Sequence, residues 1–436
     1  MNMVEKILAR KSGHKSVTPG DVVVADVDLM VMHDLSANFV MKVFDNEMEG
    51  AAIADPSKLV FAFDHNFSPA TREAAEALAA VRRFAARHRV FNLFDSGCGS
   101  IHHVIMEAGL VAPGMIVIGC DSHTPIYGAL GAFATGVGNN SMAALGFAHG
   151  KGWFKVPETI KIHFHGTTME GVGPRDISQY LVGKLGEDGA IYKALEYGGP
   201  YIEGLDVNDR SLFPLQAIDV GGKCGFVNPD EKTARFAGEL LGPKLASALF
   251  EHLQNDPNPR YAEVVDIDVS KIEPQVACPP TVGNVKPIDA AVGTPINVAE
   301  AGGSTGGRLS DIRTLARCLA NRRVHPGVRL QVVAASRGIY LAALKEGLFE
   351  TLHTAGANIF PPSAGSNQAF NMGALAEDEV MISTQARNFP GRNGHPKARH
   401  FLASALTVAA SALTGKISDP RTLEKSTLSA AKVSGQ

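Results

Sequence analysis

The chain has 436 residues, of which 45% are hydrophobic and 19% are charged. This length exceeds what a single hydrophobic core supports, so we expect two or three domains of an ordinary globular protein. The formal net charge of −3 lacks the basic excess that binding to nucleic acid or to an anionic membrane surface requires. An anionic ligand would therefore have to be bound by a local group of basic residues.

The sequence shows neither the apolar core of a signal peptide nor a run of about 20 apolar residues that could cross a membrane. We therefore expect a cytoplasmic protein. The five cysteines are widely separated and show no C-x-x-C spacing. This pattern favours buried thiols over a disulfide framework. They are Cys98, Cys120, Cys224, Cys278 and Cys318.

Short apolar runs alternate with helical patterns in the first third of the chain. Strands are predicted at residues 22–32, 58–65, 90–97 and 115–123. An alanine-rich amphipathic helix is predicted between Thr71 and His88, with Thr71 as its N-cap. This alternation indicates an α/β fold with largely parallel sheets.

Polar residues follow three of these predicted strands directly. They are Asp64 and His65, Asp95 and Ser96, and the run Asp121-Ser122-His123. In parallel sheets the carboxyl ends of the strands meet at one edge, where ligand crevices form. We therefore expect these side chains to gather near a ligand.

The C-terminal third repeats the α/β pattern after a region of different composition. Residues 255–285 are rich in Pro, Asn and Asp and predict a long linker with one strand, so we place a domain boundary near residue 285. A strand at 328–336, a helix through Phe349 and a strand ending near Gln385 follow. The polar segment 421–436 predicts a flexible tail.

Histidines occur at three positions that suit acid–base chemistry: His65, the pair His102-His103, and His123. A single histidine is more simply explained as a hydrogen-bonding partner of its own loop. Three of them beside acidic or hydroxyl groups, at equivalent strand ends, favour a proton-transfer site.

A second group of candidates is basic. Arg387 and Arg392 lie five residues apart in a loop turned by Pro and Gly, and guanidinium groups bind carboxylates in bidentate fashion. Two solvated surface arginines are the alternative. The glycine-rich turn 301–308 ends in Arg308 and could form a backbone nest for an anion, although such turns are common.

These segments, in this order, resemble the large subunits of isopropylmalate isomerase and homoaconitase, in the aconitase superfamily. The resemblance covers residues 4 to 420, and its most specific part is the pairing of DSHT with RNFPGR. It rests on DVDLMVMHD (26–34), FDH (63–65), GSIHHVIMEAGLVAPGMIVIGCDSHTPIYGALGAFATGVG (99–138), WFKVPETIKI (153–162), STQARNFPGR (383–392) and LASALTVAASALTGKISDP (402–420).

The resemblance implies an aconitase-like fold, with three α/β domains around a central crevice. Two intertwined lobes would occupy residues 1–284 and a third domain residues 285–420. The implied substrate is a small di- or tricarboxylate hydroxy acid that loses and regains water. Catalytic roles are implied for Asp64, His65, His102, Asp121 and His123, and substrate binding for His33, Ser122, Arg308, Arg387 and Arg392.

Members of this family hold a four-iron cluster through three cysteines. The matching positions here are Ser304, Ala364 and Asn367, so all three thiolates are missing. We therefore expect no cluster and predict no other cofactor. A divalent metal held by His65, His102, His123, Asp121 or Asp219 is an alternative.

The leading hypothesis is a cluster-independent hydro-lyase or isomerase acting on a small hydroxy- or unsaturated carboxylate. The resemblance also implies a separate small subunit of the swivelling-domain type, and no nucleic-acid or membrane partner. Two alternatives are a non-catalytic carboxylate-binding or regulatory subunit, and a conventional 3-isopropylmalate dehydratase large subunit with displaced cluster ligands.

Overall fold

The computed structural model describes the whole chain except residues 49, 139–140, 242–252, 370 and 424–436. The fold is α/β, as predicted, and forms two compact units. The first unit contains Met1–Asp95, Val104–His165 and Asp188–Ile267, and the second contains Ser96–His103, Gly166–Glu187 and Asp268–Gln436. Most of the predicted tail, from residue 424 on, lies outside the described residues. None of the described helices has the length and hydrophobicity needed to cross a bilayer.

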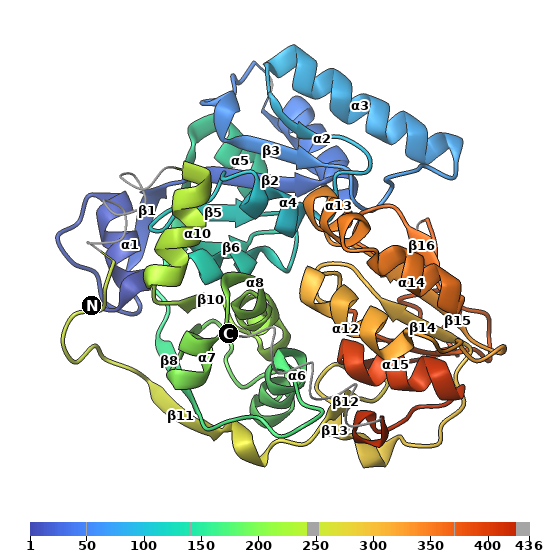
Figure 1. Ribbon diagram of the computed structural model, residues 1–436. Helices are drawn as coiled ribbons and strands as arrows, with labels where there is room; N and C mark the ends of the chain where they lie inside the picture. The colour runs from blue at the N-terminus through green and yellow to red at the C-terminus, as the bar shows by residue number, and fades with distance from the viewer. Residues whose placement is uncertain (49, 139–140, 242–252, 370, 424–436) are drawn as a thin grey trace. The chain divides into compact units, whose positions relative to one another are not determined.

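A five-stranded parallel sheet forms the centre of the first unit (Figure 1). Its order is β4 (Asn92–Phe94), β3 (Leu59–Ala62), β2 (Leu29–His33), β5 (Ile116–Gly119) and β6 (Phe133–Gly136). The helices of this region are α1 (Met3–Ser12), α2 (Asp34–Glu47), α3 (Arg72–His88), α4 (Ile101–Glu107) and α5 (Ser141–His149).

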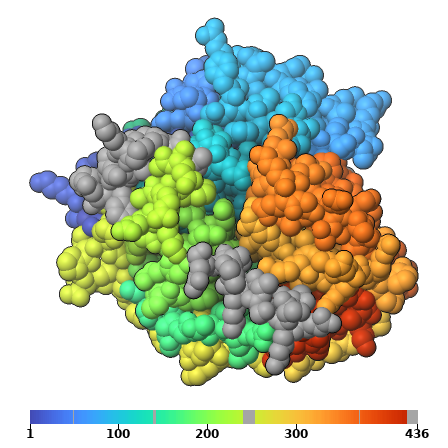
Figure 2. Space-filling view, viewed as in Figure 1, coloured from blue at the N-terminus to red at the C-terminus, as the bar shows by residue number. Residues whose placement is uncertain are grey.

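The helix α3 shows how sequence pattern places an element against this core. Its buried residues Leu78, Val81, Phe84 and Ala85 recur at helical spacing, while its other face reaches the surface (Figure 2). The predicted N-cap is confirmed, because the Thr71 side chain accepts a hydrogen bond from the backbone N–H of Ala74 at 3.1 Å.

Two smaller sheets complete the first unit. A four-stranded sheet has the order β10 (Cys224–Val227), β9 (Ala194–Gly198), β8 (Thr159–His165) and β11 (Glu263–Asp268). Strands β1 (Val22–Asp26) and β7 (Lys151–Lys155) form an antiparallel ribbon. The accompanying helices are α7 (Pro200–Gly204), α8 (Val207–Arg210), α9 (Leu212–Leu215) and α10 (Glu231–Leu241).

The second unit is built on a seven-stranded mixed sheet. Its order is β13 (Val285–Pro287), β12 (Gln275–Ala277), β18 (Arg399–Ala403), β17 (Val380–Ser383), β14 (Val298–Ala301), β15 (Arg329–Val333) and β16 (Asn358–Phe360). The last five are parallel, and β12 is antiparallel to both of its neighbours. The helices are α6 (Pro174–Leu185), α12 (Leu309–Leu319), α13 (Arg337–Lys345), α14 (Leu348–Ala355) and α15 (Ala405–Thr414).

Short 3-10 helices occur in both units. They are η1 (Pro56–Lys58), η2 (Thr124–Leu130), η3 (Gln216–Val220), η4 (Val269–Lys271), η5 (Ile288–Ala290), η6 (Asn367–Ala369) and η7 (Pro420–Thr422).

The structure corrects three predicted elements. The single strand expected at 22–32 is two strands, β1 and β2, because the Asp28 carboxylate between them accepts the backbone N–H of Ile116 and pairs with Lys11. The helix expected through Phe349 breaks at Gly347, whose φ of 69° is left-handed. The expected linker 255–285 holds two strands, β11 and β12, and reaches the start of β13. The expected domain boundary near residue 285 stays a prediction.

Candidate active site

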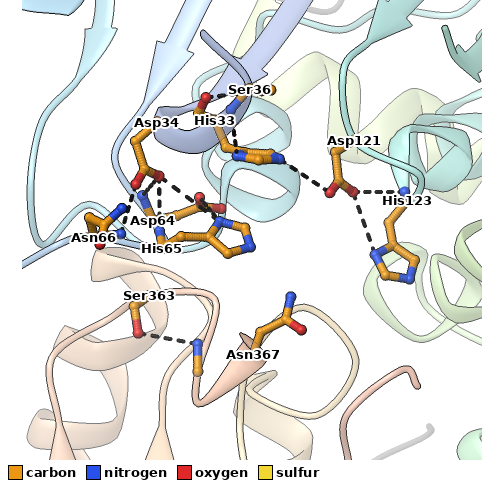
Figure 3. Close-up of polar contacts among 12 residues, drawn as sticks. His33, Asp34, Ser36, Asp64, His65, Asn66, Asp121, His123, Ser363 and Asn367 are labelled. Carbon is orange, nitrogen blue, oxygen red and sulfur yellow. Dashed lines mark hydrogen bonds and ion pairs between the residues drawn. The ribbon is translucent and has the colours of Figure 1, made fainter. Parts of the chain in front are cut away.

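The carboxyl ends of three neighbouring strands in the first unit carry most of the predicted acid–base residues. Strands β3, β2 and β5 are adjacent and parallel, so the residues after each strand meet at one edge of the sheet. Figure 3 shows His33 at the end of β2 with Asp34 next to it, Asp64 and His65 after β3, and Asp121 and His123 after β5. Of the polar groups expected to gather at strand ends, those after β3 and β5 lie at this edge.

The pair of Asp64 and His65 is the most tightly coupled feature of this edge. Asp64 Oδ1 lies 2.7 Å from His65 Nδ1, and both side chains are almost fully buried. Burial by itself would lower the pKa of His65, but the charge and hydrogen bond of Asp64, aided by Asp34 and Asp121, raise it to about 9. His65 is therefore an imidazolium at neutral pH and can donate a proton.

Asp34 holds the turn that presents this pair, and sequence reasoning missed it. Its buried carboxylate accepts the backbone N–H groups of Asp64 at 3.2 Å, His65 at 3.0 Å and Asn66 at 2.8 Å. The available signal was position alone, because Asp34 directly follows β2 and opens α2. Three backbone donors fix the β3 turn and so fix the direction of His65.

His33 links this pair to the next strand. Its Nδ1 accepts the N–H of Ser36 at 3.4 Å as the N-cap of α2, which places the proton of the neutral ring on Nε2. Nε2 then faces Asp121 Oδ2 at 3.6 Å, and the ring lies 4.5 Å from that of His65. Burial, together with the charge of His65, lowers the pKa of His33, so this ring is the neutral partner of a charged one.

The turn Asp121-Ser122-His123 follows β5. Asp121 Oδ1 accepts the backbone N–H of His123 at 2.7 Å and lies 3.5 Å from its Nδ1. Asp121 therefore lies between the rings of His33 and His123 (Figure 3). The hydroxyl of Ser122 is half-buried in this turn and makes no hydrogen bond with the described part of the chain.

Asp95, which follows β4, forms a surface ion pair and does not join the acid–base group. Its carboxylate forms a bidentate pair with Arg82 of α3 at 2.7 and 2.8 Å, and both side chains are largely exposed. This pairing accounts for Asp95 as a surface contact of α3.

Other predicted site residues belong to the second unit. His102 is buried at the start of α4, and the neighbouring His103 donates from Nε2 to the backbone carbonyl of Ser304 at 2.9 Å. Burial lowers the pKa of His103 to about 4, although the Ser304 contact opposes this. His103 is therefore a neutral structural contact, and His102 remains the candidate of the two.

The arginines of the second unit differ in their partners. Arg392 is buried, stacks on the Phe389 ring at 5.1 Å and donates a hydrogen bond to Asn367. Arg387 is half-buried in the same loop. Arg308 is buried in a bidentate pair with Asp311, at 2.8 Å for both contacts, which accounts for its burial without a substrate.

The glycine-rich turn that precedes Arg308 is explained by close packing. A side chain at Gly306 would lie 1.9 Å from Thr384 Oγ1, and one at Gly307 would lie 2.5 Å from the carbonyl oxygen of Val333. These glycines let the turn lie against strand ends of its own sheet. An anion nest is not needed to account for them.

Comparisons with known proteins agree with this architecture. The profile of the aconitase family (aconitate hydratase) matches residues 5–301 and 292–415. The chain is 42% identical over 419 residues to 3-isopropylmalate dehydratase large subunit 1 of Methanopyrus kandleri, covering 96% of this chain and 98% of the relative. The chain belongs to the aconitase family. This assignment places it among hydro-lyases, as the sequence predicted.

Further relatives within the aconitase family are similar over nearly the whole chain. A probable methanogen homoaconitase large subunit of Methanothermobacter thermautotrophicus is 41% identical over 97% of this chain and 98% of its own. A 3-isopropylmalate dehydratase large subunit of Aquifex aeolicus is 39% identical, with coverages of 96% and 97%. The solved structure of Thermococcus kodakaraensis aconitase X aligns at 11% identity and a TM-score of 0.48 over 83% of each chain, a likeness too weak to add to this assignment.

The family resemblance implies an iron–sulfur cluster, but the donor set at the matching positions does not fit one. Ala364 offers only a methyl group, and the Asn367 carboxamide accepts a hydrogen bond from Arg392. Ser304 has a hydroxyl in place of the thiolate that cluster iron requires.

The cysteines of the chain do not supply replacement ligands at these loops. Cys120, Cys224 and Cys318 are buried in hydrophobic cores, and burial raises the pKa of the first two to about 12 and of Cys318 to about 11. Cys98 and Cys278 are half-buried and lie outside the turns 302–308 and 363–367.

Within the first unit, one group of side chains has the spacing of a divalent-metal site, with candidate ligand atoms within 4.8 Å of one another: His33, Asp34, Asp64 and His65. Their hydrogen bonds suit proton transfer better. Asp34 already accepts three backbone N–H groups, and the imidazolium form of His65 has no lone pair for a metal. A divalent metal therefore stays the alternative to a metal-free site that the sequence raised.

Proposed function

We propose that this chain is the large subunit of a cluster-independent hydro-lyase that removes water from, or adds it to, a small hydroxy- or unsaturated di- or tricarboxylate. The observation that carries the proposal is the buried pair of Asp64 and His65. A buried imidazolium held by a carboxylate can protonate a departing hydroxyl group. The missing thiolates at positions 304, 364 and 367 support the view that no iron assists this step.

Each residue has a distinct part in the proposed reaction. His65 donates its proton to the leaving hydroxyl, and Asp64 stabilises the imidazolium and fixes the ring. Asp34 is a positioning residue for this turn. After dehydration, Asp121, His33 and His123 relay a proton back to His65, and in the hydration direction the neutral His65 accepts a proton from the attacking water. Arg387 and Arg392 bind the carboxylates. His102 stays a candidate for the proton relay and Ser122 for substrate contact, whereas the pair with Asp311 accounts for Arg308.

Proton donation alone limits which substrates suit this site. General acid catalysis contributes about 10²–10⁴-fold, which is modest for expelling hydroxide from an unactivated alcohol. We therefore propose a substrate whose hydroxyl leaves readily, or an activated alkene that is hydrated. An isomerisation would use the same chemistry, because it combines loss of water with its re-addition.

A small-subunit partner belongs to the proposal. Three relatives that are 39–42% identical to this chain are named as large subunits, and their names imply a second chain. We propose that a small subunit supplies the base that removes the substrate proton, because the chemistry needs a base in addition to the charged His65.

In the experiment, the chain is combined with a small-subunit homologue encoded near it, and both proteins are purified without oxygen. Iron and divalent metals are quantified first, and then C4–C8 hydroxy diacids and their alkenes are screened for water loss or gain. We expect turnover without stoichiometric metal. Iron-rich, coloured protein would support a conventional dehydratase with displaced ligands, and carboxylate binding without turnover would support a regulatory subunit. Either result would overturn the proposal.

A further inference from the structure

A pocket of about 500 Å³ lies in the first unit at the carboxyl end of β6, the edge strand of the five-stranded sheet. It is lined by Gly136 at the end of β6, by residues of the ribbon β1–β7, and by Tyr192 and Lys223. None of the predicted site residues lines it. The carboxyl edge of a parallel sheet is where such folds bind ligands.

Two lysines in this pocket have no acidic partner among the residues that the structure describes. The ammonium groups of Lys155 and Lys223 lie over the same ring, 5.8 and 5.6 Å from the centre of Tyr192. No carboxylate in the described part of the chain forms an ion pair with either of them. Lys223 is half-buried, and its desolvation lowers its pKa. A partly desolvated cation normally has a partner, so Lys223, with the exposed Lys155 over the same ring, indicates a place for an anion.

A third lysine shows what a completed arrangement looks like. Lys161 lies 5.3 Å from the centre of the Tyr261 ring, in the same kind of cation–π contact. Its ammonium group is also 4.0 Å from the buried carboxylate of Glu196. The pocket lysines have the same aromatic contact, but no carboxylate of the described residues pairs with them.

Apolar side chains make up much of the remaining pocket lining. Trp153, the single tryptophan of the chain, is 54% exposed there, and Val22 on the paired strand is 69% exposed. Val137 and Met142 add to this lining. An exposed apolar surface beside two cations suits a ligand with an anionic group and an apolar body.

The backbone around Tyr192 is built to present its ring. Tyr192 has a φ of 58°, a left-handed conformation that is unusual for an aromatic residue. Its N–H donates to the carbonyl of Gly221 at 3.0 Å, and its hydroxyl donates to the carbonyl of Lys155 at 3.3 Å. These bonds hold the ring beneath both lysines despite the strain.

We propose that this pocket binds a small organic anion with an aromatic or branched apolar body. Lys155 and Lys223 contact the carboxylate, sulfonate or phosphate group, and Trp153 contacts the body. The site is separate from the Asp64 and His65 pair and does not depend on the proposed function.

The test uses 8-anilinonaphthalene-1-sulfonate, an anion with an aromatic body, and the fluorescence of the single tryptophan. We expect energy transfer from Trp153 to the bound dye, and its loss in Trp153→Phe. Benzoate should displace the dye, whereas benzylammonium, of similar shape and opposite charge, should not. Displacement by both compounds alike would overturn the proposal.

Lysine variants locate the anionic contact. Lys155→Gln and Lys223→Gln should each raise the Kd of the dye by roughly tenfold, since each removes a charge-assisted contact. Lys161→Gln is the matched control and should leave the Kd unchanged. Lys155 is exposed, so its variant gives a result even if Lys223→Gln fails to fold. An unchanged Kd in Lys155→Gln would contradict the assignment.

Discussion

The two units differ in the kind of side chain that stands at their candidate functional positions. In the first unit, the edge formed by β3, β2 and β5 carries carboxylates and imidazoles that alter one another's pKa, with Asp64 and His65 at the centre. In the second unit, positions 304, 364 and 367 carry neutral side chains. One of them, Asn367, accepts a hydrogen bond from Arg392.

This difference separates two requirements of a dehydratase. Groups that move protons need strong electrostatic coupling in a buried place, and the first unit supplies it. Groups that hold iron need thiolates, and positions 304, 364 and 367 of the second unit carry Ser, Ala and Asn. We therefore propose that the hydroxyl group departs by proton donation. Substitutions in each unit can test the two sides of this comparison.

The largest effect is expected from His65→Gln on the substrate that the screen identifies. Loss of the proton donor should lower kcat by about 10²–10⁴-fold with little change in KM, because the carboxylate contacts remain. His165→Gln is the matched control, since His165 forms an exposed pair with Asp266 at 2.7 Å and should not affect turnover. Near-normal kcat in His65→Gln would mean that proton transfer does not occur at this edge.

A smaller and pH-dependent effect is expected from Asp64→Asn. The acidic form of His65 is present below its pKa of about 9, and without the Asp64 charge burial should bring this pKa toward or below the ordinary 6.5. Activity that needs the imidazolium should therefore fall off at a lower pH in the variant, and the loss should be greatest between these two values. The measurement is the alkaline limb of the pH–rate profile.

The matched control for this shift is Asp266→Asn, which alters the exposed Asp–His pair of the same unit. Its alkaline limb should coincide with that of the unaltered chain. If the alkaline limb of Asp64→Asn also coincides with that of the unaltered chain, the group that titrates is not His65. That result would weaken the first half of the comparison.

On the second unit, Arg392→Gln should raise KM by roughly 10- to 100-fold, because one charge-assisted carboxylate contact is lost, with a smaller change in kcat. Arg308→Gln provides the contrast. Its loss leaves Asp311 without its buried partner, so it should lower the free energy of unfolding by about 3–5 kcal/mol while KM is unchanged. If Arg308→Gln raised KM while Arg392→Gln only lowered the free energy of unfolding, Arg308 and not Arg392 would be the carboxylate-binding arginine.

Much of the fold could be predicted from sequence, because apolar runs and their polar ends determine where strands stop. The predicted polar groups after the strands at 58–65 and 115–123 do lie at one edge of the sheet. The break at Asp28 could not be predicted from its own segment, since it depends on Ile116 and Lys11. The break at Gly347 had a local signal, a glycine within the predicted helix.

The residue types of the site could be predicted from the sequence, and so could the pairing of Asp64 with His65, but other partnerships could not. Sequence reasoning chose Asp64 and His65, yet it missed Asp34, whose three backbone contacts form only when β2 and β3 are adjacent. Arg308 was chosen as a weak carboxylate contact, although Asp311 three positions later is the spacing of an ion pair on one helix turn. The proposed roles of the arginines and His102 stay predictions.

The smallest effect is expected at a cap that the sequence did predict. Thr71→Ala removes the hydrogen bond to the N–H of Ala74 at the start of α3 and should lower the free energy of unfolding by about 1 kcal/mol. Chemical denaturation measures this change, with Thr71→Ser as the control that keeps the acceptor. Because α3 lies on the outer face of the first unit, kcat and its pH profile should be unchanged. A shift in either would mean that the acid–base edge responds to general loosening of the unit, and the effects expected for His65 and Asp64 would then need correction for stability.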